Sequence, residues 1–340
     1  MKVSWETLSI ETTHPFGISR NVRTGEEVVW LHLELDGVEG WGEADPSAYY
    51  GETAATATAA LERLSTRIGE IEDPFALEAI ERDIGAMIGK NGAARAAVSA
   101  ALHDWIGKKV GLPLWRLWGL DPAGAPLSSF TIGIDTPERM AEKTREAADF
   151  PILKIKLGSD DDRARLEAVR GAAPDRVLRV DANAAWTPRE AVAGCAMCAE
   201  FGVEFVEQPL PPDRNADLAF VRERSPLPII VDESSIVASD IPGLAGLCDG
   251  INIKLAKCGG PREAIRMVHV ARAHGLSVML GCMLETTLGI APAAHMSPLV
   301  DFADLDGAAL LANDPFVGPR LDAGRIVLGD EPGLGVAPAG

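Results

Sequence analysis

Two lysines and three carboxylates stand at nearly even intervals in the middle of the chain, each after a short apolar run. They are Lys156 in LKIKLG, Asp181 in RVDAN, Glu207 in FVEQP, Asp232 in IIVDES and Lys254 in INIKLAK. Carboxylates without cysteine or histidine are hard oxygen ligands, which suit Mg²⁺, with Mn²⁺ as a substitute, and argue against zinc. Single acids that cap helices are common after strands. Three on consecutive strands, between two lysines, favour a site for one metal ion per subunit.

The two lysines are suited to moving a proton. A lysine buried beside a dication and a second lysine has its charged form disfavoured, so part of the population can act as a base near neutral pH. When a metal holds the carboxylate of a substrate, loss of the α-proton adds a second negative charge, which the metal offsets. One lysine would take the proton and the other would return one to the opposite face. The product would be the epimer.

The spacing of these residues also indicates the elements that must position them. An interval of roughly 25 residues matches one strand, one loop and one helix, and a repeat of this unit winds parallel strands around a common axis. Eight strand candidates alternate with helical patterns from SSFTIGI to VDFADLDG. We therefore expect a modified TIM barrel, (β/α)7–8, over residues 124–313, with the reactive side chains on the rim formed by the strand ends.

Residues 1–123 have a different pattern, with strands before helices. VVWLHLEL and GVEGWGEA read as strands with glycine turns, and residues 52–107 are Ala-rich and helical, so an α+β capping domain is expected. HPFGISRNVRTGEE lacks apolar periodicity and is expected to be a mobile loop. The tail, residues 314–340, holds a candidate hairpin in FVGPRLDAGRIVLG and is expected to return to the capping domain.

Composition excludes several classes of protein. The chain has 340 residues, a formal net charge of −18 and no Lys/Arg-rich stripe that could follow a phosphate backbone, so nucleic acid is not an expected partner. No apolar run approaches a membrane span, and MKVSWETLSI has no signal core. We expect a cytoplasmic homo-oligomer. The five cysteines, including Cys195 and Cys198 in a CxxC, are expected to be buried reduced thiols rather than a zinc or redox site.

The rim motifs resemble those of the enolase superfamily, specifically its muconate lactonizing enzyme subgroup. The resemblance rests on LKIKLG, VDAN, VEQP, DES and NIKLAKCGG, and GWGEA and GLPLWRLWG are similar to segments of the family's capping domain. It implies that Lys156 and Lys254 are the acid/base pair and that the three carboxylates hold the metal. It also implies that Lys154 helps to hold the substrate carboxylate and that Asn183 and Glu233 support the site.

A pair of acids near the eighth strand indicates the substrate class. Asp304 and Asp306 in FADLDG are similar to the DxD of dipeptide epimerases, in which the pair binds the α-ammonium of the N-terminal residue. Two carboxylates that face the mouth of a barrel can offset a substrate cation. The alternative is a polar segment that leaves the barrel.

The resemblance extends to residues that would surround the side chain of the epimerised residue. PFGISRNVRTGEE is similar to a loop of L-Ala-D/L-Glu epimerases, and Arg20 matches their glutamate-binding arginine if one residue is deleted after the phenylalanine. Arg23 is a competing candidate. Thr131 and Glu285 look like further positions in the substrate pocket, although Glu285 could instead be a surface acid or a partner of Lys254.

The sequence thus predicts epimerisation at the C-terminal residue of an L,L-dipeptide, with L-Ala-L-Glu as the best candidate, by two-lysine 1,1-proton transfer through a metal-stabilised enediolate. The alternatives on the same scaffold are o-succinylbenzoate synthase, N-succinylamino acid racemase and muconate cycloisomerase, which have no ammonium to bind. A non-catalytic metal-binding barrel is a different class. The mandelate racemase subgroup, which uses a seventh-strand histidine, is disfavoured because His269, His274 and His295 lie in helical segments. The resemblance suggests a role in murein peptide recycling.

Overall fold

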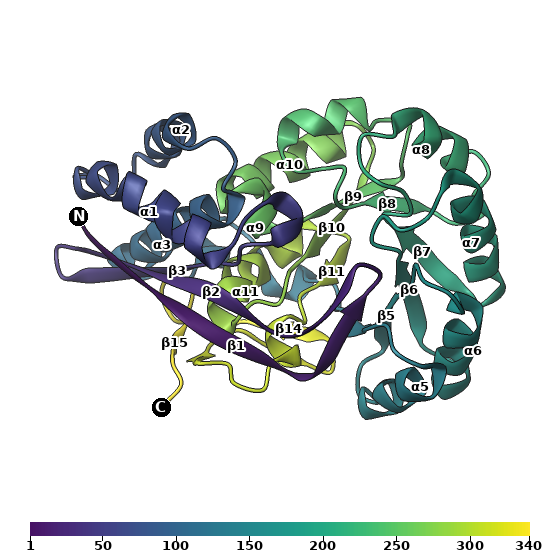
Figure 1. Cartoon of the computed structure of the whole chain (residues 1–340). Coiled ribbons are helices and arrows are strands. Elements are labelled where there is room, and N and C mark those ends of the chain that lie inside the picture. The colour runs from purple at the N-terminus through teal and green to yellow at the C-terminus, as the bar shows by residue number, and fades with distance from the viewer.

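An eight-stranded parallel sheet winds into a barrel in the computed structural model, which describes residues 1–340 (Figure 1). The strands neighbour one another in chain order. Ser129 N, beside the first strand, donates a hydrogen bond to Ala303 O in the last strand (3.0 Å), which brings the two edges together. The strands are β4 (Phe130–Ile132), β5 (Ile152–Lys156), β6 (Val177–Asp181), β7 (Val203–Glu207), β8 (Ile229–Val231), β9 (Gly250–Ile253), β10 (Ser277–Gly281) and β11 (Phe302–Asp304).

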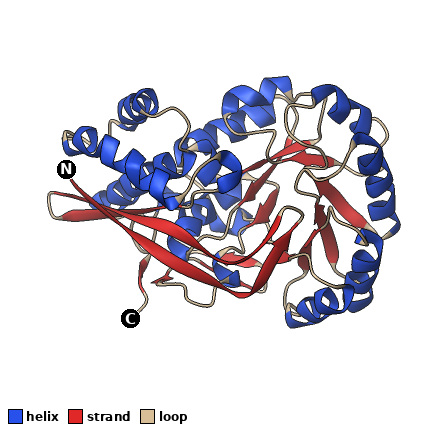
Figure 2. Cartoon of the chain, in the orientation of Figure 1, coloured by secondary structure: helices blue, strands red, loops and turns tan.

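Helices cover the outer face of this barrel (Figure 2). They are α5 (Pro137–Glu146), α6 (Asp162–Ala172), α7 (Pro188–Glu200), α8 (Asn215–Arg222), α9 (Leu255–Cys258), α10 (Pro261–Ala273) and α11 (Thr287–Met296). Between β8 and β9 the chain forms only the 3₁₀ helix η3 (Ala238–Gly243). The predicted (β/α)7–8 barrel is therefore confirmed, with one helix of the repeat reduced to a 3₁₀ turn.

The barrel core is built from the apolar runs that identified the strands. A cluster of 45 buried residues joins the strands to the inner faces of the helices. Cys195 and Cys198 belong to this cluster as free thiols on α7, which confirms the expectation that they are buried reduced residues. No helix has the length and apolar character that a membrane crossing requires.

The capping domain consists of an antiparallel sheet and a layer of helices. Its elements are β1 (Lys2–Ile18), β2 (Asn21–Leu35), β3 (Val38–Ala44), α1 (Ala54–Gly69), α2 (Leu77–Met87), α3 (Gly92–Val110) and α4 (Leu114–Leu117). Strand β3 packs so closely on α3 that a Cβ at Gly42 would stand 2.1 Å from Ala97 O. The glycines of GWGEA thus permit the strand to contact the helix backbone. The predicted α+β cap is confirmed.

The prediction of a loop over HPFGISRNVRTGEE is wrong, because these residues complete a long β-hairpin. Strands β1 and β2 pair as far as Ile18 and Asn21, with an irregular register between Glu11 and Phe16. Most side chains of this segment are exposed or half-buried, so the backbone ladder rather than apolar burial holds the ribbon together. Apolar periodicity therefore could not reveal it. The tip of the hairpin reaches across to the barrel near β5 (Figure 1).

The C-terminal tail forms the expected hairpin and contacts both parts of the molecule. Strands β13 (Arg320–Asp322) and β14 (Arg325–Val327) pair in antiparallel fashion, and Ile326 joins the barrel core. Strands β12 (Phe316–Val317) and β15 (Ala337–Pro338) form a second pair, and the Phe316 ring packs 5.1 Å from Trp30 in the cap. The division of the chain near residues 123 and 313 stays a prediction.

Candidate active site

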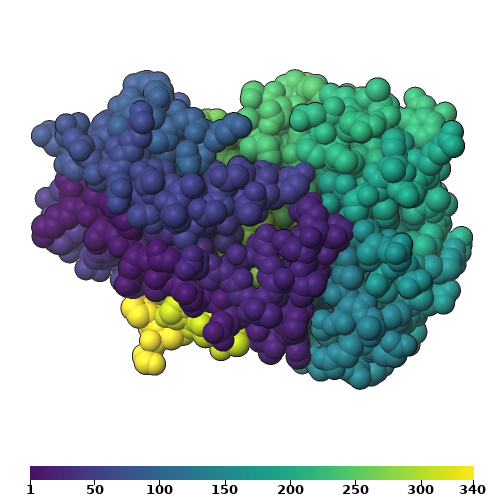
Figure 3. Space-filling model, in the orientation of Figure 1, coloured from purple at the N-terminus to yellow at the C-terminus, as the bar shows by residue number.

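A cavity of about 330 Å³ lies between the carboxyl ends of the barrel strands and the capping domain. The β1–β2 hairpin and the segment around the 3₁₀ helix η1 (Ala48–Tyr50) form its upper wall, and the hairpin lies directly against the barrel in Figure 3. Side chains from β4, β5 and β11, and from residues that follow β6, β8, β9 and β10, form the opposite wall. The polar groups predicted from the strand ends therefore face a partly enclosed space, which the cap completes.

The three predicted metal ligands lie at or just after the ends of neighbouring strands and are almost completely buried. Asp181 and Glu207 end β6 and β7, and Asp232 follows β8. Asn183 orients Asp181, since its backbone N and Nδ2 donate to the two carboxylate oxygens (2.8 and 3.2 Å). Asn183 therefore contacts a predicted metal ligand, and its supporting role stays a prediction. These strand ends set the carboxylates on one rim, as the spacing predicted.

Lysine ammonium groups stand among these carboxylates. Lys154 Nζ lies 2.7 Å from Glu207 Oε2 and 3.3 Å from Asp181 Oδ2, and Lys156 Nζ donates to Asp181 Oδ2 at 2.7 Å. As the side chains stand, no three acidic, histidine or cysteine residues are close enough to hold a metal ion by themselves. The expected convergence of the three carboxylates on a single point is therefore not present in this arrangement, because the lysines occupy the space between them.

The donor set nevertheless fits a divalent cation. Six buried carboxylates face four buried lysines and the Arg20 guanidinium, so the acids outnumber the cations by one; the acids are Asp181, Glu207, Asp232, Glu233, Asp304 and Asp306, and the lysines are Lys154, Lys156, Lys254 and Lys257. In addition, no hydrogen bond reaches the buried Glu207 Oε2, although the Lys154 ammonium is near. Buried negative charge without a full set of partners is costly. A dication held by Asp181, Glu207 and Asp232 would supply the missing charge.

The ionisation of the acids differs along the rim. Burial disfavours the charged form of Asp232, but Lys254 and Lys257 outweigh it and hold its pKa far below the usual range. Glu207 has the opposite balance, since burial and the neighbouring Asp181 raise its pKa. Burial and Asp232 also raise the pKa of Glu233 to about 7. The charged forms of Glu207 and Glu233 are thus disfavoured, whereas that of Asp232 is favoured.

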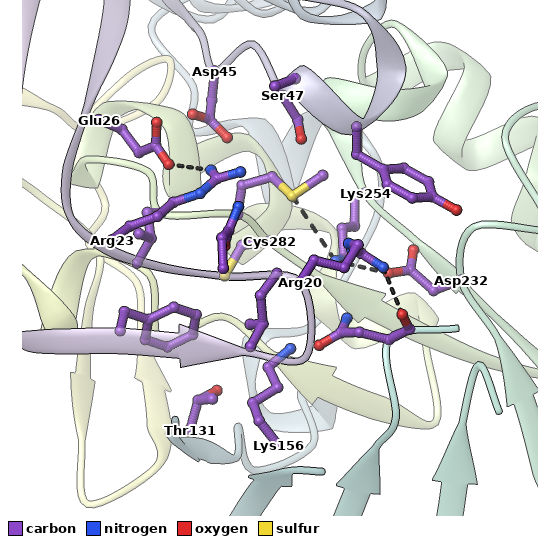
Figure 4. Close-up of a pocket in the computed structure, with 18 of the residues that line it drawn as sticks. Arg20, Arg23, Glu26, Asp45, Ser47, Thr131, Lys156, Asp232, Lys254 and Cys282 are labelled. Atoms are coloured by element: carbon purple, nitrogen blue, oxygen red, sulfur yellow. Dashed lines mark hydrogen bonds and ion pairs between the residues drawn. The ribbon is translucent and has the colours of Figure 1, made fainter. Parts of the chain in front are cut away.

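Lys156 and Lys254 face the cavity from different walls. Lys156 belongs to β5 and Lys254 follows β9, and these strands are four apart in a ring of eight. In Figure 4 the Lys254 side chain lies above and the Lys156 side chain below. Lys254 Nζ lies 2.9 Å from Asp232 Oδ2. Burial lowers the pKa of Lys254, but the attraction of Asp232 outweighs burial and raises it. The expectation of a partly neutral lysine therefore does not hold while Asp232 is its direct partner.

The two acids of FADLDG lie where the barrel closes, between β11 and β4. Asp304 accepts hydrogen bonds from Ser129 Oγ (2.6 Å) and Lys154 Nζ (2.7 Å), and Asp306 Oδ2 accepts one from the backbone N of Thr131 (2.6 Å). Burial and the charge of Asp304 raise the pKa of Asp306 to about 7. Both acids and Thr131 line the cavity. An ammonium group between them would relieve their mutual repulsion.

Both candidate arginines of the hairpin line the cavity, and both already have partners (Figure 4). Arg20 donates to Glu233 Oε1 (3.1 Å) and to Asn183 O (2.6 Å), and its guanidinium lies 4.2 Å from the centre of the Tyr49 ring. Arg23 is bound by Glu26. The position of Glu233 beside Arg20 ties the hairpin tip to the barrel. A substrate carboxylate would have to exchange with one of these acids to reach either guanidinium.

Glu285 lies outside the cavity lining, in a buried acidic group between the barrel and the cap. Its carboxylate accepts from the backbone N of Met283 (3.0 Å), and burial raises its pKa. Glu43 stands nearby; burial raises the pKa of Glu43 to about 8, and Glu285 adds to that rise. Glu285 is therefore neither a surface acid nor a side chain that faces the space where a substrate would lie.

Sequence reasoning missed several buried groups that hold the acids in place. The Lys257 ammonium binds Asp232 Oδ1 and three backbone oxygens, those of Asp232 (2.7 Å), Ser235 (3.1 Å) and Asn252 (3.0 Å). The Asn252 side chain donates to Glu207 Oε1 at 2.7 Å. The signals were present in INIKLAK, where asparagine precedes Lys254 by two residues on the same strand and a second lysine follows by three. Their partners, however, are distant in sequence.

We expect Lys257→Met to lower activity by roughly 10- to 100-fold, as is typical when a group that orients a metal ligand is lost. The methionine keeps the length of the side chain but leaves Asp232 without its fixed donor. The measurement is the Mg²⁺ affinity by calorimetry together with the turnover rate. Lys109→Met, at a partly exposed position on α3, is the control. Unchanged Mg²⁺ affinity in a folded Lys257 variant would contradict this role.

Two family models match nearly the whole chain. The model for the mandelate racemase / muconate lactonizing enzyme N-terminal domain matches residues 3–119, and the enolase C-terminal domain-like model matches residues 138–339. The chain therefore belongs to the mandelate racemase/muconate lactonizing enzyme family of the enolase superfamily. The predicted family is confirmed.

Individual relatives within this family share both sequence and structure with the chain. An L-Ala-D/L-Glu epimerase of Bacteroides thetaiotaomicron is 42% identical over 338 residues, which cover 99% of this chain and 88% of the relative. A dipeptide epimerase of Enterococcus faecalis, solved with Mg and the dipeptide L-Leu-L-Tyr, superimposes with a TM-score of 0.94 at 35% identity over 99% of each chain. A substrate-liganded L-Ala-D/L-Glu epimerase of Bacillus subtilis gives a TM-score of 0.94 at 31% identity over 100% of each chain.

Proposed function

We propose that this protein is a Mg²⁺-dependent dipeptide epimerase that inverts the α-carbon of the C-terminal residue. The observation that carries the proposal is the combination of two lysines on opposite walls with a buried aspartate pair at the strand closure. The lysines suit proton transfer at both faces of one carbon, and the aspartates suit a free α-ammonium. The activities named for the relatives from Bacteroides, Enterococcus and Bacillus support the same reaction class.

The proposed roles of the residues follow from their positions. Asp181, Glu207 and Asp232 would hold the metal, which when bound offsets the negative charge that develops on the substrate carboxylate. Lys156 removes the α-proton from one face and Lys254 delivers a proton to the other, or the reverse for the opposite isomer. Engagement of Asp232 with a metal would weaken its hold on the Lys254 ammonium. That change would lower the pKa of Lys254 towards the range of a useful base.

The binding of the dipeptide is assigned to groups around this centre. Lys154 helps to hold the carboxylate that loses the proton, and Asp304 and Asp306 bind the α-ammonium. L-Ala-L-Glu is the proposed substrate, with Arg20 or Arg23 as the partner of its side-chain carboxylate. A cytoplasmic location, a homo-oligomeric state and a role in the turnover of cell-wall peptides are parts of the same proposal.

A screen of L,L-dipeptides in D₂O with Mg²⁺ tests the reaction. Deuterium should enter Cα of the second residue, and the rate should be greatest for L-Ala-L-Glu or a related dipeptide. The signal is the loss of the α-proton resonance by NMR. Mg²⁺ binding without exchange in any dipeptide would indicate the alternative of a non-catalytic metal-binding barrel.

We expect Asp306→Asn to remove a pH dependence of substrate binding. Because the pKa of Asp306 is raised to about 7, its charge is present above pH 7 and is lost below it. In the unmodified protein KM for L-Ala-L-Glu should therefore rise by about tenfold from pH 8 to pH 6, because the charged fraction of Asp306 falls by about tenfold over this range. The variant should have a high KM at both pH values. A parallel pH profile in the two proteins would contradict the assignment.

We expect Asp304→Asn to distinguish the proposed substrate class from its alternatives. Loss of this charge should raise KM for dipeptides by roughly 10- to 100-fold, because a buried charge-assisted hydrogen bond to the ammonium is lost. N-succinylamino acids carry no ammonium, so any activity on them should fall much less than the activity on dipeptides. Greater activity on N-succinylamino acids, retained in the variant, would favour the racemase alternative.

A further inference from the structure

A second cavity of about 220 Å³ lies beneath the β1 strand. It lies beside the cavity of about 330 Å³ described above, which we call the reaction cavity. We call it the side chamber and define it by Phe16, Phe130, Thr131, Ala147, Phe150 and Leu310. Three of these residues, Phe16, Thr131 and Leu310, also line the reaction cavity, and no others are shared between the two. The two cavities therefore adjoin at these three residues.

The roof of the side chamber is the irregular part of the β-hairpin. Between the Glu11 and Phe16 pairs, four residues of β1 stand opposite a single residue of β2, so β1 arches outward. Backbone hydrogen bonds hold both ends of the arch to neighbouring segments. Glu11 O accepts from Ala312 N (2.8 Å) and Gly17 O accepts from Ile134 N (2.7 Å). A Cβ at Gly17 would lie 2.3 Å from Ile134 O, so the second fastening requires glycine.

The side chamber has an apolar floor, and one side of it is polar, where the buried Lys143 ammonium donates to Pro15 O (3.4 Å) and Asp135 Oδ2 (3.0 Å). The rings of Phe130 and Phe150 lie 4.5 Å apart between centroids on its floor, beside the buried Ala147. On the solvent side, His14 and Glu146 form an ion pair at 3.0 Å, and both are largely exposed.

The position of the chamber identifies the group that would enter it. Thr131 donates its backbone N to Asp306 at 2.6 Å, so the chamber begins next to the aspartate pair proposed to bind the α-ammonium. The N-terminal residue of a dipeptide carries its side chain on the same carbon as that ammonium. Lys156 and Lys254 are both absent from the chamber lining, so the epimerised carbon lies further away.

We infer that the side chamber receives the side chain of the N-terminal residue of the substrate, and that the enzyme accepts aromatic or branched apolar residues there. This inference rests on the proposed function and narrows its substrate class. Alanine would leave the chamber empty, whereas phenylalanine would cover the apolar surface of Phe130 and Phe150. Turnover of L-Phe-L-Glu should therefore have a kcat/KM at least equal to that of L-Ala-L-Glu.

Two substitutions that reduce the chamber test the inference. Ala147→Leu fills it from the floor, and Ala309→Trp fills it from an exposed position on the 3₁₀ helix η5 (Ala308–Leu310). Each should lower kcat/KM for L-Phe-L-Glu by about tenfold or more, the scale on which apolar pockets discriminate, and change that for L-Ala-L-Glu by less than about twofold. Ala59→Trp, on the exposed face of α1, is the matched control.

The outcomes separate this inference from the proposed function. Activity on L-Ala-L-Glu serves as the folding control in every variant, and Ala309→Trp remains informative if Ala147→Leu fails to fold. Turnover of L-Ala-L-Glu without turnover of L-Phe-L-Glu would overturn the inference and leave the function intact. An unchanged ratio of kcat/KM for L-Phe-L-Glu to kcat/KM for L-Ala-L-Glu in both folded variants would overturn it as well. Absence of exchange in every dipeptide would instead overturn the proposed function.

Discussion

The variants Lys156→Ala and Lys254→Ala should each lack net epimerisation, with a loss of at least about 1,000-fold in kcat. General acid–base groups contribute roughly 10² to 10⁴ in rate, and inversion requires both groups in the same turnover. The loss should be in kcat rather than in KM, because Asp304 and Asp306 still bind the ammonium. Polarimetry of L-Ala-L-Glu gives the rate, and Lys90→Ala, at an exposed position of the cap, is the control.

The lysine variants should also differ from each other in a way that reveals the two faces. In D₂O, a protein that retains one lysine can exchange the α-proton of only the isomer that presents this proton to it. Lys156→Ala and Lys254→Ala should therefore exchange opposite isomers of the epimerised residue. The readout is the NMR signal of each isomer incubated separately. Exchange of both isomers by one variant would mean that a single base serves both faces and would refute the two-lysine assignment.

Loss of the metal should have an effect as large as loss of a lysine. We expect Glu207→Gln to abolish turnover and Mg²⁺ binding, because it removes one of the three carboxylates proposed to hold the metal. Mg²⁺ should raise the melting temperature of the unmodified protein, since a ligand that binds only the folded state stabilises it. This rise should be absent from the variant. Chelation of the metal in the unmodified protein should likewise stop exchange, and addition of Mg²⁺ should restore it.

We also expect Glu207→Gln not to lower the melting temperature of the metal-free protein. In the metal-free state, Glu207 is a buried acid with a raised pKa, so its charge is unfavourable at neutral pH. Metal-free Glu207→Gln should therefore melt no lower than the metal-free unmodified protein. Glu200→Gln, at an exposed acid on α7, should leave both the Mg²⁺ response and the activity unchanged. A Glu207 variant that keeps its Mg²⁺ response would show that the cation is held elsewhere.

The barrel and the order of its reactive residues could be predicted because they depend on local pattern. Asp181 and Glu207 end apolar strands, and parallel strands of one sheet bring their carboxyl ends to the same rim. Spacing alone therefore placed these residues together. The aspartates near β11 could likewise be assigned from a short motif, since Asp304 and Asp306 are two residues apart on an extended segment.

Other features could not be predicted because they depend on partners that are distant in sequence. The ribbon that carries Arg20 is largely exposed, so no hydrophobic alternation marked it as strand. The pairing of Arg20 with Glu233 joins residues of the cap and the barrel. The direct contact of Lys254 with Asp232 reversed the expected direction of its pKa shift, because the attraction between a buried pair exceeded the effect of burial. The surroundings of Glu285 could not be predicted for a similar reason, since they come partly from the cap.

The hairpin has a consequence for how this enzyme family can diversify. Its outer part, residues 14–27, is held by main-chain hydrogen bonds between the strands and by backbone contacts with the barrel, and most of the side chains there lie outside the hydrophobic core. Mutations there can alter which molecules are admitted while the proton-transfer machinery on the barrel rim is left intact. Substitutions in the hairpin can thus change the substrate preference while the protein stays folded and active.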